Sequence, residues 1–195
     1  MTNRPFDLII YGATSFVGQI LTRYLFEHIH VGDKVNWAIA GRSEKKLAVL
    51  KSSLGSSADA LPVIVADADD ETALATMCQS ARVIASTVGP YALYGEPLVK
   101  ACAENGTDYC DLCGEAYWIK AMILKYSDSA KASGARIVSC CGFDSIPSDL
   151  GVHFLQRQGK QRFSKYFDDV KLAVNTMKGG ASGGTLASMI EAVKA

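Results

Sequence analysis

The sequence DLIIYGATSFVG, residues 7–18, joins an apolar run to a turn that contains glycine at Gly12 and again at Gly18. The apolar run predicts a buried β-strand, and the apolar spacing after the turn predicts an amphipathic helix. Gly12 would end the strand, and Gly18 would lie one turn into the helix. A strand, a glycine-containing turn and a helix in this order are typical of the first unit of a dinucleotide-binding α/β domain.

The turn follows the G-x-x-G-x-x-G spacing, with Ser15 at the position of the middle glycine. Gly12 suits a tight turn, and Gly18 suits close packing of the helix on the strand. Ser15 suits the helix N-cap, because its hydroxyl can accept an N–H of the first turn, and it can also donate to a phosphate oxygen. The backbone N–H groups of residues 15–17, including that of Val17, would face a pyrophosphate at the positive end of the helix. The alternative is an ordinary βα turn that binds no ligand.

Short β-branched runs alternate with stretches of helical spacing along most of the chain. Strands are expected at residues 7–12, 35–41, 61–67, 81–87, 107–112 and 135–141. In the first helix, two rows are expected to form one apolar face: Phe16, Ile20 and Tyr24, and Val17, Leu21 and Leu25. The alternation predicts right-handed crossovers, and strands that are apolar almost throughout suit a sheet covered on both faces. The predicted fold class is therefore α/β, a Rossmann-like doubly wound parallel sheet.

The pattern changes after residue 147. Pro147 and Ser148 open a predicted helix, residues 168–177 alternate like a half-exposed strand, and a glycine-rich loop at residues 178–184 precedes a further helix. We therefore expect an NAD(P)-binding Rossmann domain over residues 1–147. Residues 148–195 are expected to begin a C-terminal α+β domain for substrate binding or dimerisation, which is incomplete in this chain.

The end of the second strand predicts which dinucleotide binds. An NAD site usually places a carboxylate there for the ribose 2′-hydroxyl. This chain has Arg42 at the tip, followed by Ser43, with Lys45 and Lys46 just behind. A guanidinium suits a 2′-phosphate and can stack on adenine, so the sequence predicts NADP rather than NAD. The alternative is that Ser43 only caps a helix whose basic residues are solvated.

The ends of the third and fourth strands supply further candidates. Asp67 is placed to meet the adenine edge, whereas Asp69 and Asp70 are expected to cap and charge the next helix. The fourth strand should lie beside the first, and the loop after it contains Thr87, Gly89 and Pro90. Ligands of open α/β sheets bind in the crevice at such carboxyl ends, so this loop should lie near the nicotinamide ribose.

No residue set identifies a catalytic acid or base. The chain has no Tyr-x-x-x-Lys pair, and Tyr91 and Tyr94 could either face a substrate or pack in the turn that begins a helix. In CGFDSIPSDLG, residues 141–151, Asp144 is expected to hold a turn between domains or else to lie at the mouth of the cleft. Tyr91 and Asp144 are therefore weak catalytic candidates. A hydride transfer tolerates this, because the cofactor carries the hard step.

The composition narrows the classes of partner. Twenty Lys and Arg balance twenty Asp and Glu, so nothing indicates nucleic acid or an anionic membrane surface. No apolar run reaches the ~18 residues of a transmembrane segment, and no signal-peptide core is present, so we expect a cytoplasmic protein. Its cysteines are expected to be reduced. Cys110 and Cys113 form a C-x-x-C that could be a redox pair or half a zinc site, but without a second pair at suitable spacing we expect no metal.

Five segments occur in a familiar order over essentially the whole chain: YGATSFVG, AGR, TVGPYALYGEPLVKACAENGTDYCDLCGE, CGFDSIPSDLG and SGGTLASMIE. Together they resemble the saccharopine dehydrogenase-like oxidoreductases, a family that includes the trans-acting enoyl reductases of lipid and polyketide synthesis. The resemblance implies an N-terminal NADP-binding Rossmann domain and a C-terminal α+β domain that closes over the cofactor. It also implies three groups of site residues: Gly12, Thr14, Ser15, Phe16 and Gly18 for the pyrophosphate, Arg42 for the 2′-phosphate, and Thr87 and Gly89 for the nicotinamide side. The family usually has glycine where Ser15 stands.

The predicted function is that of an NADP-dependent oxidoreductase. It would move hydride between NADPH and an unsaturated or imine-type carbon of a small-molecule or lipid-like substrate, including the enoyl groups of lipids and polyketides. A homodimer formed through the second domain is consistent with this prediction. The alternative is a catalytically silent Rossmann module with a regulatory or scaffold role, including one at a lipid surface.

Overall fold

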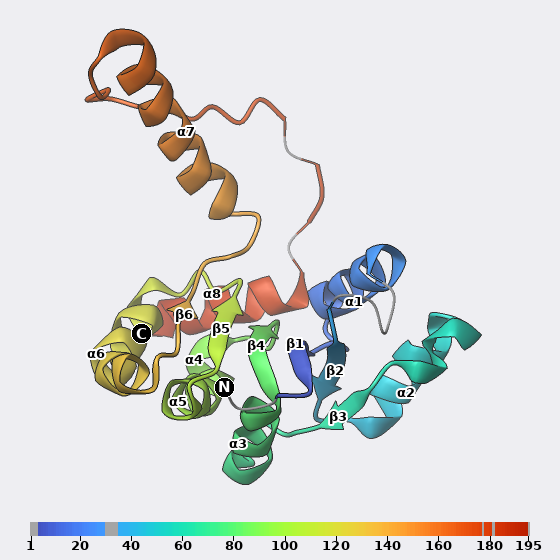
Figure 1. Ribbon diagram of the computed structural model, residues 1–195. Helices are drawn as coiled ribbons and strands as arrows, with labels where there is room; N and C mark the ends of the chain where they lie inside the picture. The colour runs from blue at the N-terminus through green and yellow to red at the C-terminus, as the bar shows by residue number, and fades with distance from the viewer. Residues whose placement is uncertain (1–3, 30–34, 177, 181, 195) are drawn as a thin grey trace.

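A six-stranded parallel sheet forms the centre of the computed structural model, which describes residues 4–29, 35–176, 178–180 and 182–194 (Figure 1). The strands are β1 (Phe6–Tyr11), β2 (Trp37–Gly41), β3 (Val63–Val65), β4 (Ala81–Ser86), β5 (Asp108–Asp111) and β6 (Ile137–Val138). Their order in the sheet is β3-β2-β1-β4-β5-β6. The order reverses between β1 and β4, and this is the switch point at which such sheets bind ligands. The predicted Rossmann-like fold class is confirmed.

Helices cover the sheet on both faces. Those that pack on its faces are α1 (Phe16–His28), α2 (Glu44–Ser53), α3 (Glu71–Ser80), α5 (Glu96–Asn105) and α6 (Ala116–Ser133). The described residues also form α4 (Tyr91–Tyr94), α7 (Ile146–Phe163), α8 (Gly183–Lys194) and a 3₁₀ turn at Ser56–Ala60. Successive residues of a strand point to opposite faces. Ile10 therefore packs with Leu47 and Leu50 of α2, whereas Ile9 packs with Leu74 of α3 and Leu98 of α5. Burial on both faces explains why the strands are apolar almost throughout.

Helix α1 buries only one of the two rows that the sequence predicts as a single apolar face. Leu21 and Leu25 pack against the core on the α2 side of the sheet. Phe16, Ile20 and Tyr24 remain exposed, with 69%, 53% and 57% of their surface accessible. The prediction of one continuous buried face was therefore wrong, because the core contacts only one side of the helix and the second row lies outside that stripe.

Three predicted strands differ from the structure, and the third, expected at residues 61–67, is limited to Val63–Val65. The sixth strand is limited to Ile137–Val138, because Cys140 adopts a positive φ of 62° and leaves the extended conformation. Residues 168–176 form no strand, although the sequence predicts one over 168–177, and residue 177 lies outside the described residues. This segment does not pair with the sheet, whose edge strand on that side is β6. Alternating polarity alone does not make a strand when no neighbour takes up the backbone hydrogen bonds.

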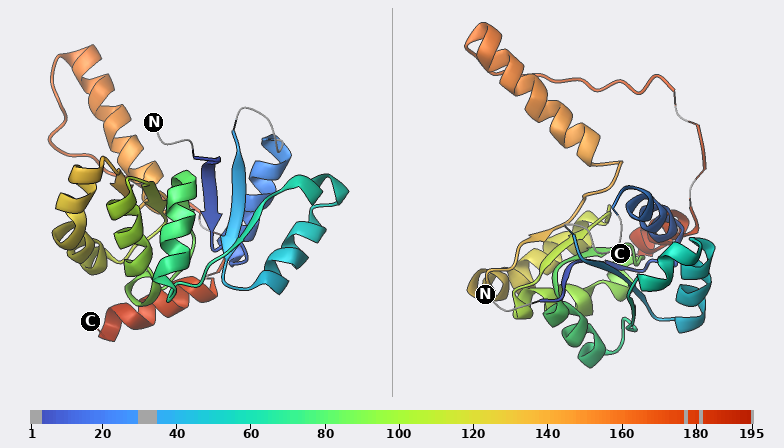
Figure 2. Two further views of the ribbon diagram at one scale, coloured as in Figure 1. Left: turned by 60° about the horizontal axis from the view of Figure 1, so that its bottom comes forward. Right: turned by 45° about the vertical axis from the view of Figure 1, so that its right-hand side comes forward.

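The C-terminal third of the chain leaves the sheet and returns to it. Helix α7 projects away from the sheet, and the following segment leads back to α8, which lies across the carboxyl ends of the strands (Figures 1 and 2). No helix within the described residues is both long and apolar enough to cross a membrane. The division into domains at residue 147 stays a prediction.

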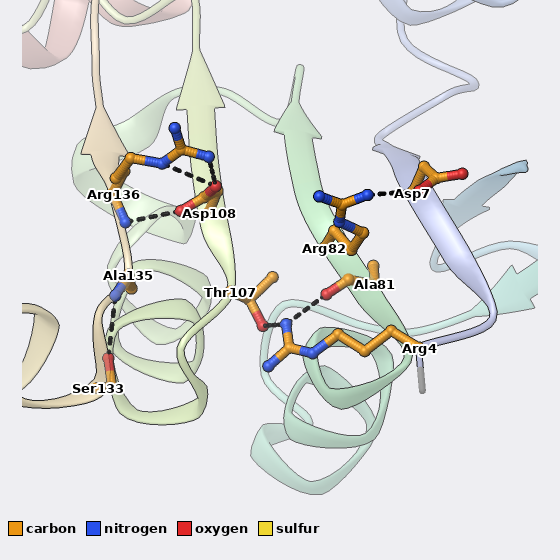
Figure 3. A network of polar contacts seen from close by, with 9 residues as sticks. All are labelled: Arg4, Asp7, Ala81, Arg82, Thr107, Asp108, Ser133, Ala135 and Arg136. Atoms are coloured by element: carbon orange, nitrogen blue, oxygen red, sulfur yellow. Dashed lines mark hydrogen bonds and ion pairs between the residues drawn. The ribbon is translucent and has the colours of Figure 1, made fainter. Parts of the chain in front are cut away.

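Polar contacts tie the opposite, amino-terminal end of the sheet together (Figure 3). The guanidinium of Arg4 donates to the carbonyl of Ala81 and to the hydroxyl of Thr107, which links the start of the chain to β4 and β5. Two ion pairs lie nearby: Asp7 with Arg82, and Asp108 with Arg136. These contacts occupy the polar groups at the amino-terminal end of the sheet. The cavities that contain the predicted site residues lie at the opposite, carboxyl end.

Candidate functional site

A first cavity of about 300 Å³ lies at the carboxyl ends of β1, β2 and β4. Most of the predicted cofactor-binding residues line it: Gly12, Thr14, Ser15, Arg42, Ser43, Asp67, Thr87 and Gly89. Phe16 and Val17 instead line a second, adjoining cavity, and Gly18 and Pro90 line neither. The fold thus brings together Gly12 and Thr87, which are 75 residues apart in the chain.

The two glycines of the first loop are required by geometry. Gly12 has a φ of +82°, and a Cβ placed there would lie 2.6 Å from Cγ2 of Val88. A Cβ on Gly18 would lie 2.2 Å from the carbonyl oxygen of Gly12. Contacts this short are sterically forbidden for a rigid backbone neighbour, and the left-handed φ at Gly12 adds strain for any other residue. The β1–α1 loop is therefore packed tightly between helix α1 and the loop after β4.

Ser15 is the N-cap of α1, as its sequence position predicts. Its Oγ accepts from the N–H of Gly18 at 2.9 Å and lies 3.0 Å from Oγ1 of Thr87. The hydroxyl of Thr87 donates to the carbonyl of Gly12 at 2.9 Å. Because a hydroxyl has one hydrogen, Ser15 is the donor in its contact with Thr87. The Ser15 hydroxyl therefore joins the β1–α1 loop to the loop after β4, and its hydrogen is used within the protein.

The start of α1 offers fewer free N–H groups than the sequence suggests. The N–H of Ser15 donates to the carbonyl of Gly12 at 2.9 Å, so it is not available to an anion. Within the described residues, the N–H groups of Phe16 and Val17 have no acceptor. Free N–H groups at the positive end of a helix are a suitable site for a phosphate. The N–H of Thr14, which lines the first cavity, likewise has no acceptor within the described residues, so the anion-binding capacity of this turn rests on three amides.

The tip of β2 places basic groups at the edge of the first cavity. Arg42 is exposed there, and Ser43 caps α2 by accepting from the N–H of Lys46 at 3.4 Å. Lys46, which was not among the predicted site residues, also lines the cavity. The structure therefore contains the cap at Ser43, which the sequence offered as the alternative interpretation, together with Arg42 at the cavity.

In the loop after β3, only one of the two aspartates that were predicted to cap α3 does so. Asp70 is the N-cap of α3 and accepts from the N–H of Ala73 at 2.9 Å. Asp69, predicted to cap the same helix, instead lines the first cavity beside Asp67. The reason is that one N-cap position exists per helix, and Asp70 occupies it. The cavity thus has both acidic and basic groups on its rim.

The second cavity has a volume of about 450 Å³ and shares Ser15, Thr87 and Gly89 with the first. Both weak catalytic candidates, Tyr91 and Asp144, line it. The hydroxyl of Tyr91 donates to the carbonyl of Ser86 at 3.1 Å, and burial raises the pKa of this phenol well above its usual range. Tyr91 is therefore a neutral group whose proton is held by the backbone. Its geometry favours a structural role for the hydroxyl.

The turn after β6 is held by Asp111 and not by Asp144. Oδ1 of Asp111 accepts from the N–H groups of Cys113 and Cys140, both at 3.0 Å. Its Oδ2 accepts from the hydroxyls of Tyr109 at 2.8 Å and Ser139 at 3.2 Å. The carboxylate of Asp144 is exposed and makes no hydrogen bond within the described residues. Sequence reasoning missed Asp111, and the signal was a carboxylate at the end of an otherwise buried strand.

The C-x-x-C motif has the properties of structural thiols. Burial raises the pKa of Cys110 to about 11 and that of Cys113 to about 12, so neither is a thiolate at neutral pH. Across the residues that the structure describes, no group of three His, Cys, Asp or Glu side chains could hold a metal ion. Cys140 and Cys141, expected within the sixth strand, follow it.

Comparison with known proteins agrees with this geometry. The family model for the saccharopine dehydrogenase NADP binding domain matches residues 8–138. "Putative trans-acting enoyl reductase Rv2449c" of Mycobacterium tuberculosis is 44% identical over 190 residues, which cover 97% of this chain and 45% of that protein. The trans-acting enoyl reductase of Mycobacterium ulcerans is 41% identical over 192 residues, covering 98% and 45%. The chain therefore spans less than half the length of these relatives.

Solved structures share the fold at low sequence identity. Saccharopine dehydrogenase (L-Glu forming) from Saccharomyces cerevisiae superposes with a TM-score of 0.54 at 15% identity, covering 79% of this chain and 32% of that one. Pen from Bacillus thuringiensis superposes with a TM-score of 0.53 at 12% identity, covering 83% and 57%. At these identities the likeness shows a common fold.

Proposed function

The chain belongs to the family of saccharopine dehydrogenase NADP-binding domains, and from this premise we propose that its first cavity binds NADP(H) in an oxidoreductase. The observation that carries the proposal is the meeting of three loops at one cavity: the β1–α1 loop, the β2 tip with Arg42, and the loop after β4. This is the expected arrangement for a dinucleotide across the switch point of a parallel sheet.

The residues present fit the cofactor in charge and in hydrogen bonding. The free N–H group of Thr14 in the first cavity, with those of Phe16 and Val17 directly after Ser15 where the two cavities adjoin, suits the pyrophosphate. Arg42 with Lys46 suits the 2′-phosphate. Thr87 and Gly89 line both cavities and therefore suit the nicotinamide side. When bound, NADPH supplies a hydride. The chain's own residues bind and orient the cofactor and form the walls that limit access of water.

The second cavity is the place we assign to the substrate, because it adjoins the first one at Ser15, Thr87 and Gly89. The relatives are named trans-acting enoyl reductases, and on that basis we propose reduction of an unsaturated carbon, with an imine-type carbon as the wider class. The proposal includes a small-molecule or lipid-like substrate, a second domain that begins at residue 148, a homodimer formed through that domain and a cytoplasmic location.

Fluorescence titration with NADPH and NADH tests the cofactor assignment. We expect NADPH to bind more tightly than NADH. Arg42→Ala should weaken NADPH binding about tenfold and change NADH binding less than about twofold. A hydrogen bond to a charged group contributes roughly 1.5–3 kcal/mol, and an exposed side chain such as Arg42 contributes toward the lower end of that range. Lys45→Ala is the matched control, because Lys45 has the same charge but does not line the first cavity. Equal weak binding of both dinucleotides would refute the proposal.

A second measurement separates the enzyme from a silent cofactor-binding module. NADPH absorbance is followed while the protein that contains this chain is mixed with a series of 2-enoyl thioesters. Oxidation of NADPH that depends on the thioester supports the reductase. Tight NADPH binding without oxidation by any acceptor of this class would instead favour the regulatory or scaffold role.

A further inference from the structure

Glu115 places a buried carboxylate at the junction of three elements. The residue lies at the N-cap position of α6, directly after the β5–α6 turn, and is 5% exposed. Its Oε1 accepts from the N–H of Tyr91 at 3.0 Å, and its Oε2 accepts from the N–H of Ala92 at 2.8 Å. Oε1 also accepts from the hydroxyl of Ser188, in α8, at 2.8 Å. A buried carboxylate is stable only when it is hydrogen-bonded in this way.

The bond from Ser188 to Glu115 differs from the other polar contacts of α8 in the sequence distance that it spans. Within the described residues, it is the only hydrogen bond or ion pair that joins α8 to a residue outside 182–194. The other polar contacts of this helix are local: Thr185 with Ser182, which directly precedes the helix, and Lys194 with Glu191 within it. The polar anchoring of α8 therefore depends on one carboxylate oxygen.

The same oxygen is bonded to the start of α4. Tyr91 follows the loop that contains Thr87 and Gly89, which lines both cavities. Ser188 and its neighbours Thr185 and Met189 form the opposite wall of the second cavity. Glu115 thus connects the wall of the second cavity that α8 supplies to the loop shared by the two cavities. A shift of either partner changes the bond available to the other.

We propose that Glu115 is a positioning residue that holds α8 closed over the second cavity and couples this closure to the loop after β4. The coupling rests on the proposed function, since it assumes that the cofactor orders this loop. A ligand that stabilises one arrangement of the loop then favours docking of α8, and by linkage docking of α8 favours that ligand. The bond from Ser188 stabilises the wall that α8 gives to the second cavity.

Hydrogen–deuterium exchange of the α8 amides tests the anchor without the cofactor. Ser188→Ala removes the donor but leaves Tyr91 and Ala92 bonded to Glu115, so it avoids the unfolding risk of replacing the carboxylate. Exchange in α8 should rise about tenfold, as expected for loss of a bond to a charged acceptor. Ser188→Thr retains the hydroxyl and should restore slow exchange. Ser127→Ala is the matched control, because its hydroxyl bonds within α6.

Unchanged α8 exchange in Ser188→Ala would overturn the proposal. Saturating NADPH should slow α8 exchange in the wild type and in Ser188→Thr, but not in Ser188→Ala. If NADPH binds and slows exchange equally in Ser188→Ala, the coupling through Glu115 is wrong. If the titration shows no NADPH binding, the proposed function and the coupling fail, whereas the exchange difference without cofactor still decides the role of Glu115 as the anchor.

Discussion

Asp111→Ala should destabilise the protein far more than loss of the other carboxylate on β5. The Asp111 carboxylate is 3% exposed and accepts four hydrogen bonds, two from backbone N–H groups and two from hydroxyls. Alanine removes all four acceptor contacts. The N–H groups of Cys113 and Cys140 are fixed in direction by the backbone and cannot reorient toward another acceptor.

The magnitude follows from counting the donors that are left without a partner. An unsatisfied buried N–H such as that of Cys113 costs roughly 1–3 kcal/mol, the partly buried N–H of Cys140 costs less, and the hydroxyls of Tyr109 and Ser139 cost less because they can rotate. The expected loss is about 3–5 kcal/mol in the free energy of unfolding, a large part of the ~5–15 kcal/mol of a typical domain. Asp111→Asn should cost only about 1 kcal/mol, since its carbonyl oxygen can serve the two N–H groups and its amide can donate to the hydroxyls.

Urea unfolding followed by circular dichroism measures these differences. Asp108→Ala is the matched control on the same strand, because Asp108 pairs with an exposed arginine and should cost less than about 1 kcal/mol. The reasoning is refuted if Asp111→Ala lies within about 1 kcal/mol of the wild type, or if Asp111→Asn is as destabilising as Asp111→Ala.

Three further predictions concern the first loop and the polar end of the sheet. Gly12→Ala should cost about 2–4 kcal/mol by urea unfolding, whereas Gly55→Ala, with a similar φ but open space around it, should cost only about 1 kcal/mol; equal costs would contradict the packing argument. Ser15→Ala should cost about 1 kcal/mol through loss of the N-cap, and no change in stability would contradict that role. Arg136 lowers the pKa of Asp108 below its ordinary 3.8, so this pair stabilises the fold above that pH, and its contribution is lost as pH falls through the lower, folded-state pKa. Asp108→Asn should therefore flatten the acid limb of stability against pH, and an unchanged limb would contradict the assignment.

Patterns local in sequence predicted most of the framework. The alternation of apolar runs with helical spacing indicated the parallel sheet, and Gly12 with Gly18 indicated the turn that the structure requires to be free of Cβ atoms. The N-cap at Ser15 was predicted correctly, and the cap at Ser43 was foreseen as an alternative, because capping depends on residues three or four positions apart. The exposure of Phe16, Ile20 and Tyr24 on α1 was not predicted, because helical spacing identifies an apolar face but does not say how much of that face the core will contact.

The sequence by itself determined the order of strands and helices along the chain, the glycine turn and the basic tip of β2, since each depends on neighbours within a few residues. Only the tertiary structure decided that Asp111 holds the turn after β6 and that Glu115 joins α4 to α8. The partners of Asp111 include Cys140, 29 residues away, and Ser188 lies 73 residues from Glu115. A carboxylate at the end of a strand can accept a hydrogen bond from any donor that the crossovers bring to it. Which donor arrives is set by the order of strands in the sheet and by the path of the returning helix, and no local spacing encodes either one.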